Sequence, residues 1–195
     1  MNQREKILRE AEKLFQTKGY DRTGIRDIGR ACNRRQSNLY NYFTSKEQIL
    51  YEIITSELTN LLSALKHLED NGKANPVEQL KAFIRIHLNH EVGSGRANRI
   101  LFDTEMKHMS NRYRRKIIEL RDTYDMILRK ILRRGRDAGV FGELNEKIVN
   151  YIVASNVMRT RLWFSPKGEL SLSEIGDEIL KFVLYGIKSR NSGNK

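Results

Sequence analysis

The side chains best suited to chemistry in this chain are hydrogen-bonding and cationic groups that cluster near its N-terminus. They accompany a short apolar pattern, because Ile25, Ile28 and Cys32 repeat at helical spacing and so predict a short helix. Asn33 follows, and Asn accepts the left-handed backbone that a tight turn needs. A second short helix is predicted over residues 35–42. Two short helices joined by a tight turn are typical of a helix-turn-helix that enters the major groove of duplex DNA.

Polar side chains in and around the second short helix predict three kinds of contact with DNA. Hydroxyl and cationic groups suit phosphate oxygens. The Gln36 and Asn38 amides suit adenine edges, and Arg35 suits guanine. The alternative for Tyr40 is packing among the helices, and the alternative for Arg34 is a solvated charge. The predicted DNA-binding residues are Thr23, Arg26, Arg34, Arg35, Gln36, Ser37, Asn38, Tyr40, Asn41, Tyr42 and Lys46.

Charge and cysteine usage narrow the class of protein. The 195 residues carry 36 Lys and Arg against 24 Asp and Glu, a net charge of +12. Such a balance favours polyanionic partners: nucleic acid, acidic membranes or phosphate-bearing ligands. The single Cys excludes an internal disulfide framework and indicates a reducing compartment. The sequence has no signal peptide and no apolar run of about 18 residues, so we expect a cytoplasmic protein with no membrane partner.

Helical periodicity dominates the chain, which has only two prolines. We therefore expect an all-α fold of nine helices. The expected helices span residues 3–18, 23–32, 35–42, 45–65, 76–92, 96–109, 111–138, 145–164 and 172–189. We expect a helix-turn-helix head over residues 1–46, a ligand-binding and dimerisation body over 47–190, and a disordered tail over 191–195.

Residues 4–50 carry a pattern that resembles the tetracycline-repressor (TetR) family of bacterial regulators. The matching residues are Ile7, Leu8, Ala11, Leu14, Phe15, Gly19, Tyr20, Thr23, Asp27, Ile28, Leu39, Tyr40, Asn41, Tyr42, Phe43, Ser45, Lys46 and Glu47. The resemblance implies an all-helical homodimer that binds palindromic operator DNA and represses transcription until a ligand releases it. The chain departs from the family in the turn, where Cys32-Asn33-Arg34-Arg35 replaces the usual Ala-Gly-Val-Ser and adds two cations.

The C-terminal half is similar, more loosely, to the members of this family that regulate acyl-CoA and lipid or steroid breakdown. The residues that carry this similarity are Arg121, Asp122, Thr123, Tyr124, Gly135, Ala138, Gly139, Val140, Phe141, Asn156, Trp163, Phe164, Gly168, Glu169, Leu170, Ser171, Leu184, Tyr185, Gly186 and Ile187. The similarity implies a small apolar effector, with an acyl-CoA as the first candidate. A drug-sensing regulator of an efflux pump is the alternative.

Polar residues on an apolar helix face give the best sequence signal for a ligand pocket. Asn156 and Arg159 lie on such a face, and a buried polar group needs a partner, which a ligand can supply. A hydrogen bond to a neighbouring helix or subunit is the alternative. The predicted ligand-binding residues are Phe83, His87, Phe102, Met106, Tyr124, Asn156, Arg159 and Trp163.

The last two expected helices are apolar on more than one face, which predicts that they pack against both their own body and a second copy of the chain. A dimer also suits a helix-turn-helix, because paired half-sites about 34 Å apart need a two-fold partner. Burial of both helices inside a monomer is the alternative. The predicted interface residues are Val153, Val157, Ile175, Ile179, Phe182, Val183 and Gly186.

Catalytic and metal-binding patterns are weak in this sequence. His87 and His90 lie three residues apart beside Glu91, and Glu105 precedes His108 at the spacing found in di-iron bundles. Such bundles need two motifs of this kind and two further Glu residues. A helical metalloenzyme that uses Glu105 and His108 is therefore only a rival interpretation. We expect neither an enzyme nor a bound metal or cofactor.

Overall fold

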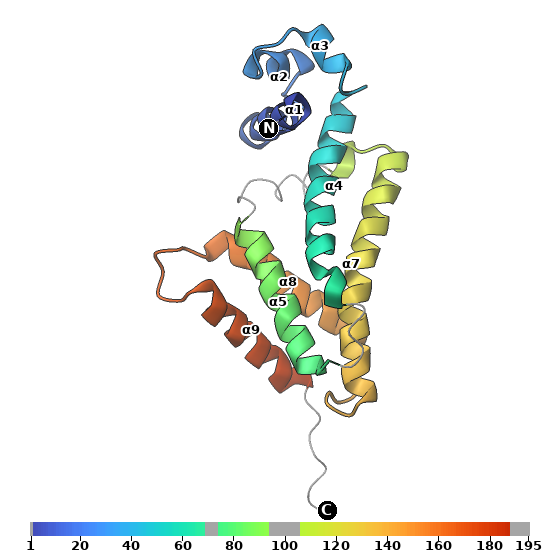
Figure 1. The fold of residues 1–195 in the computed structure, drawn as a ribbon, viewed down its shortest axis with the longest axis vertical. Coiled ribbons are helices and arrows are strands. Elements are labelled where there is room, and N and C mark those ends of the chain that lie inside the picture. The colour runs from blue at the N-terminus through green and yellow to red at the C-terminus, as the bar shows by residue number, and fades with distance from the viewer. Residues whose placement is uncertain (1, 69–73, 94–105, 188–195) are drawn as a thin grey trace, which may run out of the picture. The chain divides into compact units, whose positions relative to one another are not determined.

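The computed structural model describes residues 2–68, 74–93 and 106–187 (Figure 1). Within these ranges the chain forms eight α-helices and two short 3-10 helices, η1 and η2, which confirms the all-α prediction. The elements are α1 (Gln3–Lys18), α2 (Ile25–Ala31), α3 (Gln36–Tyr40), α4 (Lys46–Leu65), η1 (Lys66–Leu68), α5 (Pro76–Gly93), η2 (Met106–His108), α7 (Asn111–Asp137), α8 (Glu146–Trp163) and α9 (Leu172–Ile187). The helix expected over 96–109 lies mostly outside the described residues, and the tail predicted over 191–195 lies wholly outside them.

Capping residues explain where α1 begins and ends. The Asn2 side chain accepts a hydrogen bond from the Glu5 amide, and the Glu5 carboxylate accepts one from the Asn2 amide. Each side chain thus satisfies a backbone N–H group that has no partner within the helix. Gly19 ends the helix with a φ of 85°, a conformation that favours glycine. Between these caps, Ile7, Ala11 and Phe15 form the buried stripe of an amphipathic helix.

The chain divides into two compact units, and the first joins residues 1–59 with 95–120. It therefore extends past the predicted boundary at residue 46, because the first turns of α4 and the start of α7 bury side chains in the same apolar core as α1, α2 and α3. The buried members of this core are Ile7, Ala11, Phe15, Tyr20, Ile28, Cys32, Leu39, Phe43, Ile49, Leu50, Ile53, Ile54, Met109 and Ile117.

The second unit joins residues 60–94 with 121–195. Its helix α5 packs against both α8 and α9 (Figure 1). Gly176 permits close approach of α9, since a Cβ there would lie 3.1 Å from Leu88. The Arg85 guanidinium adds a hydrogen bond of 3.0 Å to Asp177 across the same contact. Among the described helices, none is both long enough and apolar enough to cross a membrane.

Candidate functional site

The turn between α2 and α3 brings the two helices into close contact. Asn33 adopts a φ of 54°, which confirms the predicted left-handed turn. The Arg34 amide donates a 2.8 Å hydrogen bond to the Gly29 carbonyl. A Cβ at Gly29 would lie only 2.9 Å from the Arg34 oxygen, so this crossing needs glycine on α2.

Helix α3 is anchored by apolar residues and presents polar ones. Leu39 and Phe43 are buried in the core of the first unit. Gln36 is half-buried, and the other polar side chains predicted to contact DNA in this region are exposed. These exposed residues are Arg26, Arg34, Arg35, Ser37, Asn38, Tyr40, Asn41 and Tyr42. The structure thus places one contiguous group of predicted contacts at the surface of α2, the turn and α3.

Thr23 does not belong to this surface, so its predicted role as a DNA contact is wrong. Its side chain is 0% exposed. The hydroxyl donates to the carbonyl of Gly19 at 2.8 Å, which holds the loop that leads from α1 to α2. Buried hydroxyls need such a partner, and here the backbone supplies it.

Lys46, which was predicted to contact a phosphate, has partners within the first unit. Its ammonium donates to the carbonyls of Tyr20 and Thr23, at 2.9 and 3.0 Å. It also lies 4.0 Å from the centre of the Tyr20 ring, within range of a cation–π interaction. This lysine therefore joins the start of α4 to the loop after α1.

A chain of four polar side chains runs through the interior of the second unit. The Tyr124 hydroxyl lies 2.8 Å from Nδ1 of His87, and His87 Nε2 lies 3.0 Å from the Glu91 carboxylate. The other Glu91 oxygen is 3.6 Å from Nε of Arg161. Phe83 packs against both rings, with centroid distances of 6.1 Å to His87 and 5.4 Å to Tyr124. We call Tyr124, His87, Glu91 and Arg161 the buried polar chain.

Helices α5, α7 and α8 supply the buried polar chain, and the sequence identified only part of it. Phe83, His87 and Tyr124 were predicted ligand-binding residues, and the structure brings them together. Glu91 and Arg161 were missed as members of the same site. The signal for Glu91 was its position one turn after His87. Arg161 continues the buried stripe of α8 one turn after Val157, and a charge in such a stripe needs a buried partner.

Three predicted pocket residues on α8 lie elsewhere. Asn156, Arg159 and Trp163 are exposed, and Trp163 is 60% exposed. The Asn156 amide donates to the Ile152 carbonyl on its own helix. These residues therefore do not line an interior site in the chain. Met106 packs on the core of the first unit, and Phe102 lies outside the described residues.

The predicted dimer interface needs a similar correction. Val153, Val157 and Val183 are buried in the core of the second unit, and Ile175 is also buried, so these side chains do not face a partner. Ile179 is half-buried and packs against that core. Phe182 is 69% exposed, and Gly186 faces open space.

The outer surfaces of α8, α9 and the segment between them carry large apolar side chains. We call this set the exposed apolar face. Its members are Ile148, Tyr151, Ile152, Leu162, Trp163, Leu170, Phe182 and Tyr185. On α8 they lie near the two ends of the helix, on the side opposite to its buried residues, and the exposed polar side chains of Ser155, Asn156 and Arg159 lie between them.

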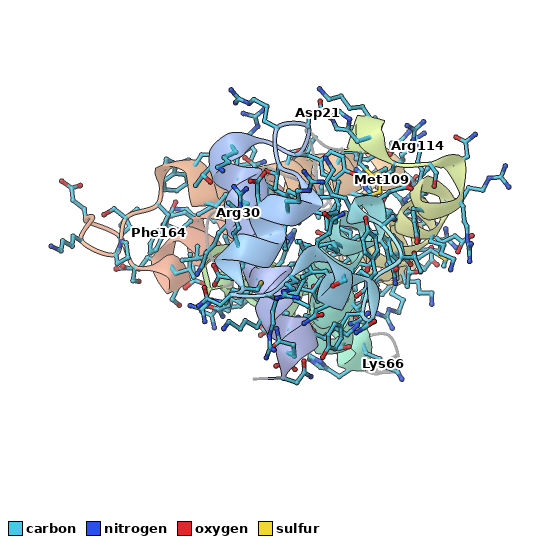
Figure 2. All side chains as sticks on the ribbon, turned by 90° about the horizontal axis from the view of Figure 1, so that it is seen from above. Asp21, Arg30, Lys66, Met109, Arg114 and Phe164 are labelled. Atoms are coloured by element: carbon cyan, nitrogen blue, oxygen red, sulfur yellow. The ribbon has the colours of Figure 1, made fainter. Side chains whose placement is uncertain are left out.

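The histidines considered as metal ligands have other partners. His108 Nδ1 lies 3.3 Å from the carboxylate of Asp21, which is labelled in Figure 2, and its ring packs on Tyr20. His87 belongs to the buried polar chain. Among the described residues, no three His, Cys, Asp or Glu side chains are grouped as a metal site. Glu105 lies outside the described ranges.

Comparison with known proteins places both parts of the chain. A family model for bacterial regulatory proteins of the tetR family matches residues 7–53, and a model for the tetracyclin repressor-like C-terminal domain matches residues 73–187. The HTH-type transcriptional repressor KstR2 of Mycolicibacterium smegmatis is 25% identical over 100% of this chain and 94% of its own length.

Solved structures show the same architecture. The TetR family transcriptional regulator PfmR from Thermus thermophilus has a TM-score of 0.82 and 33% identity, covering 94% of this chain and 99% of PfmR. AibR, solved in complex with isovaleryl coenzyme A and operator DNA, has a TM-score of 0.81 and 23% identity, covering 93% of this chain and 97% of AibR.

Proposed function

The chain belongs to the tetR family of bacterial regulatory proteins, and we propose that it is a cytoplasmic repressor whose homodimer binds a palindromic operator and leaves it when a small apolar effector binds. The observation that carries this proposal is the exposed polar surface of α2, the turn and α3. As a helix-turn-helix transcriptional regulator, the protein is not an enzyme.

Charge and geometry of the first unit support operator binding. Residues 1–50 contain eleven Lys and Arg against six Asp and Glu, a net of +5. Exposed cations of the turn, such as Arg34 and Arg35, suit phosphate oxygens, and they stand beside amides that suit base edges. Affinity from phosphate contacts falls steeply with salt, because binding releases counterions.

The exposed apolar face supports a homodimer. Large apolar side chains gathered on one surface of a soluble protein mark an interaction site. A second copy of the chain carries the same face, so two copies can pair about a two-fold axis that also relates their α3 helices. Each copy would then read one half of a palindrome.

The buried polar chain and Phe83 support an effector site in the second unit. Apolar walls with a few convergent polar groups are typical of small-molecule sites. AibR carries isovaleryl coenzyme A on the same fold, and KstR2 is named in a solved structure as a ketosteroid regulator. An acyl-CoA thioester is therefore our first candidate for the effector. Helix α4 passes without a break from the first unit into the second, so it can couple effector binding to the DNA-reading helices.

The proposal is tested by operator release. An operator selected from random duplexes is labelled, and fluorescence anisotropy follows its complex with the protein during titration with acyl-CoAs of graded chain length. Coenzyme A alone and a cationic dye serve as comparison ligands. Release by acyl-CoAs of one length range supports the proposal. Release by the dye and by no acyl-CoA would favour the drug-sensing alternative.

A variant pair localises the effector. Tyr124→Phe removes the hydroxyl that contacts His87. We expect the variant to keep its operator affinity and to respond to the acyl-CoA at least roughly fivefold more weakly, which corresponds to the loss of one hydrogen bond. Tyr113→Phe removes a hydroxyl from the part of α7 that belongs to the first unit and should respond as the wild type does. Equal responses of both variants would exclude the buried polar chain as the effector site.

A further inference from the structure

We propose that Arg26 is a positioning residue that fixes the side-chain amide of Gln36 so that Gln36 selects adenine in each half-site. The inference rests on the proposed reading of DNA by α3 and adds a specific role within it. The Nε atom of Arg26 donates to Oε1 of Gln36 at 3.1 Å. The Nε2 atom of Gln36 donates in turn to the Tyr40 hydroxyl at 3.4 Å.

The helix crossing explains why these three side chains meet. Arg26 and Gly29 are three residues apart and share one face of α2. At Gly29 the backbones approach closely, since a Cβ there would lie 2.9 Å from the Arg34 oxygen and 3.6 Å from the Gln36 nitrogen. Gln36 and Tyr40 are four residues apart on α3, so the guanidinium reaches the amide of one and that amide reaches the hydroxyl of the other.

The two bonds remove an ambiguity that a glutamine otherwise carries. A free amide can rotate and exchange its oxygen with its nitrogen, and so offer either group to a base. Here the oxygen faces a guanidinium, which only donates hydrogen bonds. Rotation by half a turn would point the amide N–H groups at the guanidinium N–H groups. The cation therefore holds Oε1 on the side of α2 and Nε2 on the side of Tyr40.

A glutamine with fixed orientation matches adenine. Its oxygen keeps a second lone pair, and its nitrogen keeps a second hydrogen. Adenine shows an N6 amino donor and an N7 acceptor in the major groove, so a glutamine can pair with both atoms at once. Guanine shows two acceptors there, and an amide oxygen would face one of them. Loss of the Arg26 contact should therefore relax the choice between the two purines.

The experiment compares base preferences and not affinity alone. Sites are selected from random duplexes with the wild type, and every base pair of one half-site is then varied in competition binding. Gln36→Ala identifies the position that Gln36 reads. We expect the wild type to prefer adenine there by about tenfold over guanine. In Arg26→Met we expect this preference to fall below about threefold, with preferences at the other positions unchanged.

Arg30 provides the matched control. It lies on the same helix, is labelled in Figure 2, has a side chain that is 81% exposed and lies 3.9 Å from Asp27. Arg30→Met removes the same charge from α2 without touching Gln36, so it should lower affinity for all sequences and keep the adenine preference. Arg26→Lys should keep the adenine preference, since an ammonium also only donates hydrogen bonds and can hold the Gln36 oxygen in the same way.

Three outcomes would contradict the inference. The adenine preference could persist in Arg26→Met, Gln36→Ala could change no position, or Arg30→Met could relax the preference equally. Failure of the wild type to select any sequence would overturn the proposed function itself, and the wild-type selection shows this before any variant is measured.

Discussion

The two units use buried polar groups for different purposes. In the first unit, Thr23 and Lys46 donate to carbonyls of the short loop after α1, so they hold local backbone. In the second unit, Tyr124, His87 and Glu91 connect helices far apart in the sequence, and Arg161 extends the series to α8. The first unit keeps the side chains proposed to bind DNA on the outside, whereas the second keeps those proposed to bind the effector inside. A partner as large as DNA needs a surface, and a small effector needs an interior.

The largest effect is expected from a substitution on the exposed apolar face of the second unit. Phe182→Glu places a charge on the exposed apolar face, where a dimer would bury it without a partner. We expect sedimentation to show monomers and specific operator affinity to fall by at least about 100-fold, because one copy grips only one half-site. Met126→Glu, at an exposed apolar site on α7, should remain dimeric. A dimeric Phe182→Glu protein would exclude this face as the interface.

The buried polar chain is tested by removing its negative charge. Glu91→Gln removes the carboxylate charge that lies 3.6 Å from Nε of Arg161 inside the second unit. We expect the free energy of unfolding in urea to fall by about 3 kcal/mol, the cost of breaking a buried ion pair. Glu78→Gln makes the same change at a more accessible position of α5 and should change stability by less than about 0.5 kcal/mol. Equal stabilities of the two variants would mean that the buried polar chain contributes little to the free energy of unfolding.

Lys46 distinguishes a structural role in the first unit from a phosphate contact. Lys46→Met removes two hydrogen bonds to carbonyls, so we expect a loss of about 2 kcal/mol in stability and faster amide exchange around Thr23. The slope of log affinity against log salt should stay as in the wild type. A slope reduced by about one would indicate that Lys46 does contact a phosphate. Lys18→Met, at an exposed position, is the control for charge.

The smallest effect concerns a carboxylate in the first unit. Burial raises the pKa of Glu12 from 4.5 to about 7, and the nearby Glu57 carboxylate adds to the shift. The folded state then binds a proton that the unfolded state releases above 4.5, so the contribution of Glu12 to stability is greatest below pH 4.5 and falls as pH rises through 7. Glu12→Gln should remove this dependence and gain about 1 kcal/mol at a pH of about 8, after allowance for solvent screening. Thermal melts between about pH 5 and pH 8 measure it, and parallel curves for both proteins would contradict the assignment.

The sequence predicted the first unit well because its signals are local. Asn33 marks the turn, and the spacing of Ile28 and Cys32 places their helix against the core. Capping residues also mark helix ends, as Ser45 does by accepting from the Gln48 amide near the start of α4. Thr23 was misread because a hydroxyl beside a DNA-reading helix looks the same whether it faces water or the backbone.

The second unit was harder to predict because periodicity shows that a helix has two faces but not which neighbour covers each. On α8, Val153 and Val157 were assigned to a partner chain and Asn156 to a pocket, and the structure exchanges these environments. The face with Val153 and Val157 packs inside the chain, and the face with Asn156 and Trp163 lies outside. Only the long-range contacts of α5 with α8 and α9 decide this, and no local pattern encodes them.

The exposed apolar face contains Trp163, and this is the single tryptophan of the chain. Intrinsic tryptophan fluorescence therefore has one source, located where two copies are proposed to meet. Dilution of the protein should shift the emission to longer wavelength as the indole passes from an apolar contact into water. The spectroscopic signal then reports assembly without any label, and the dissociation constant of the dimer can be read from it independently of DNA or effector.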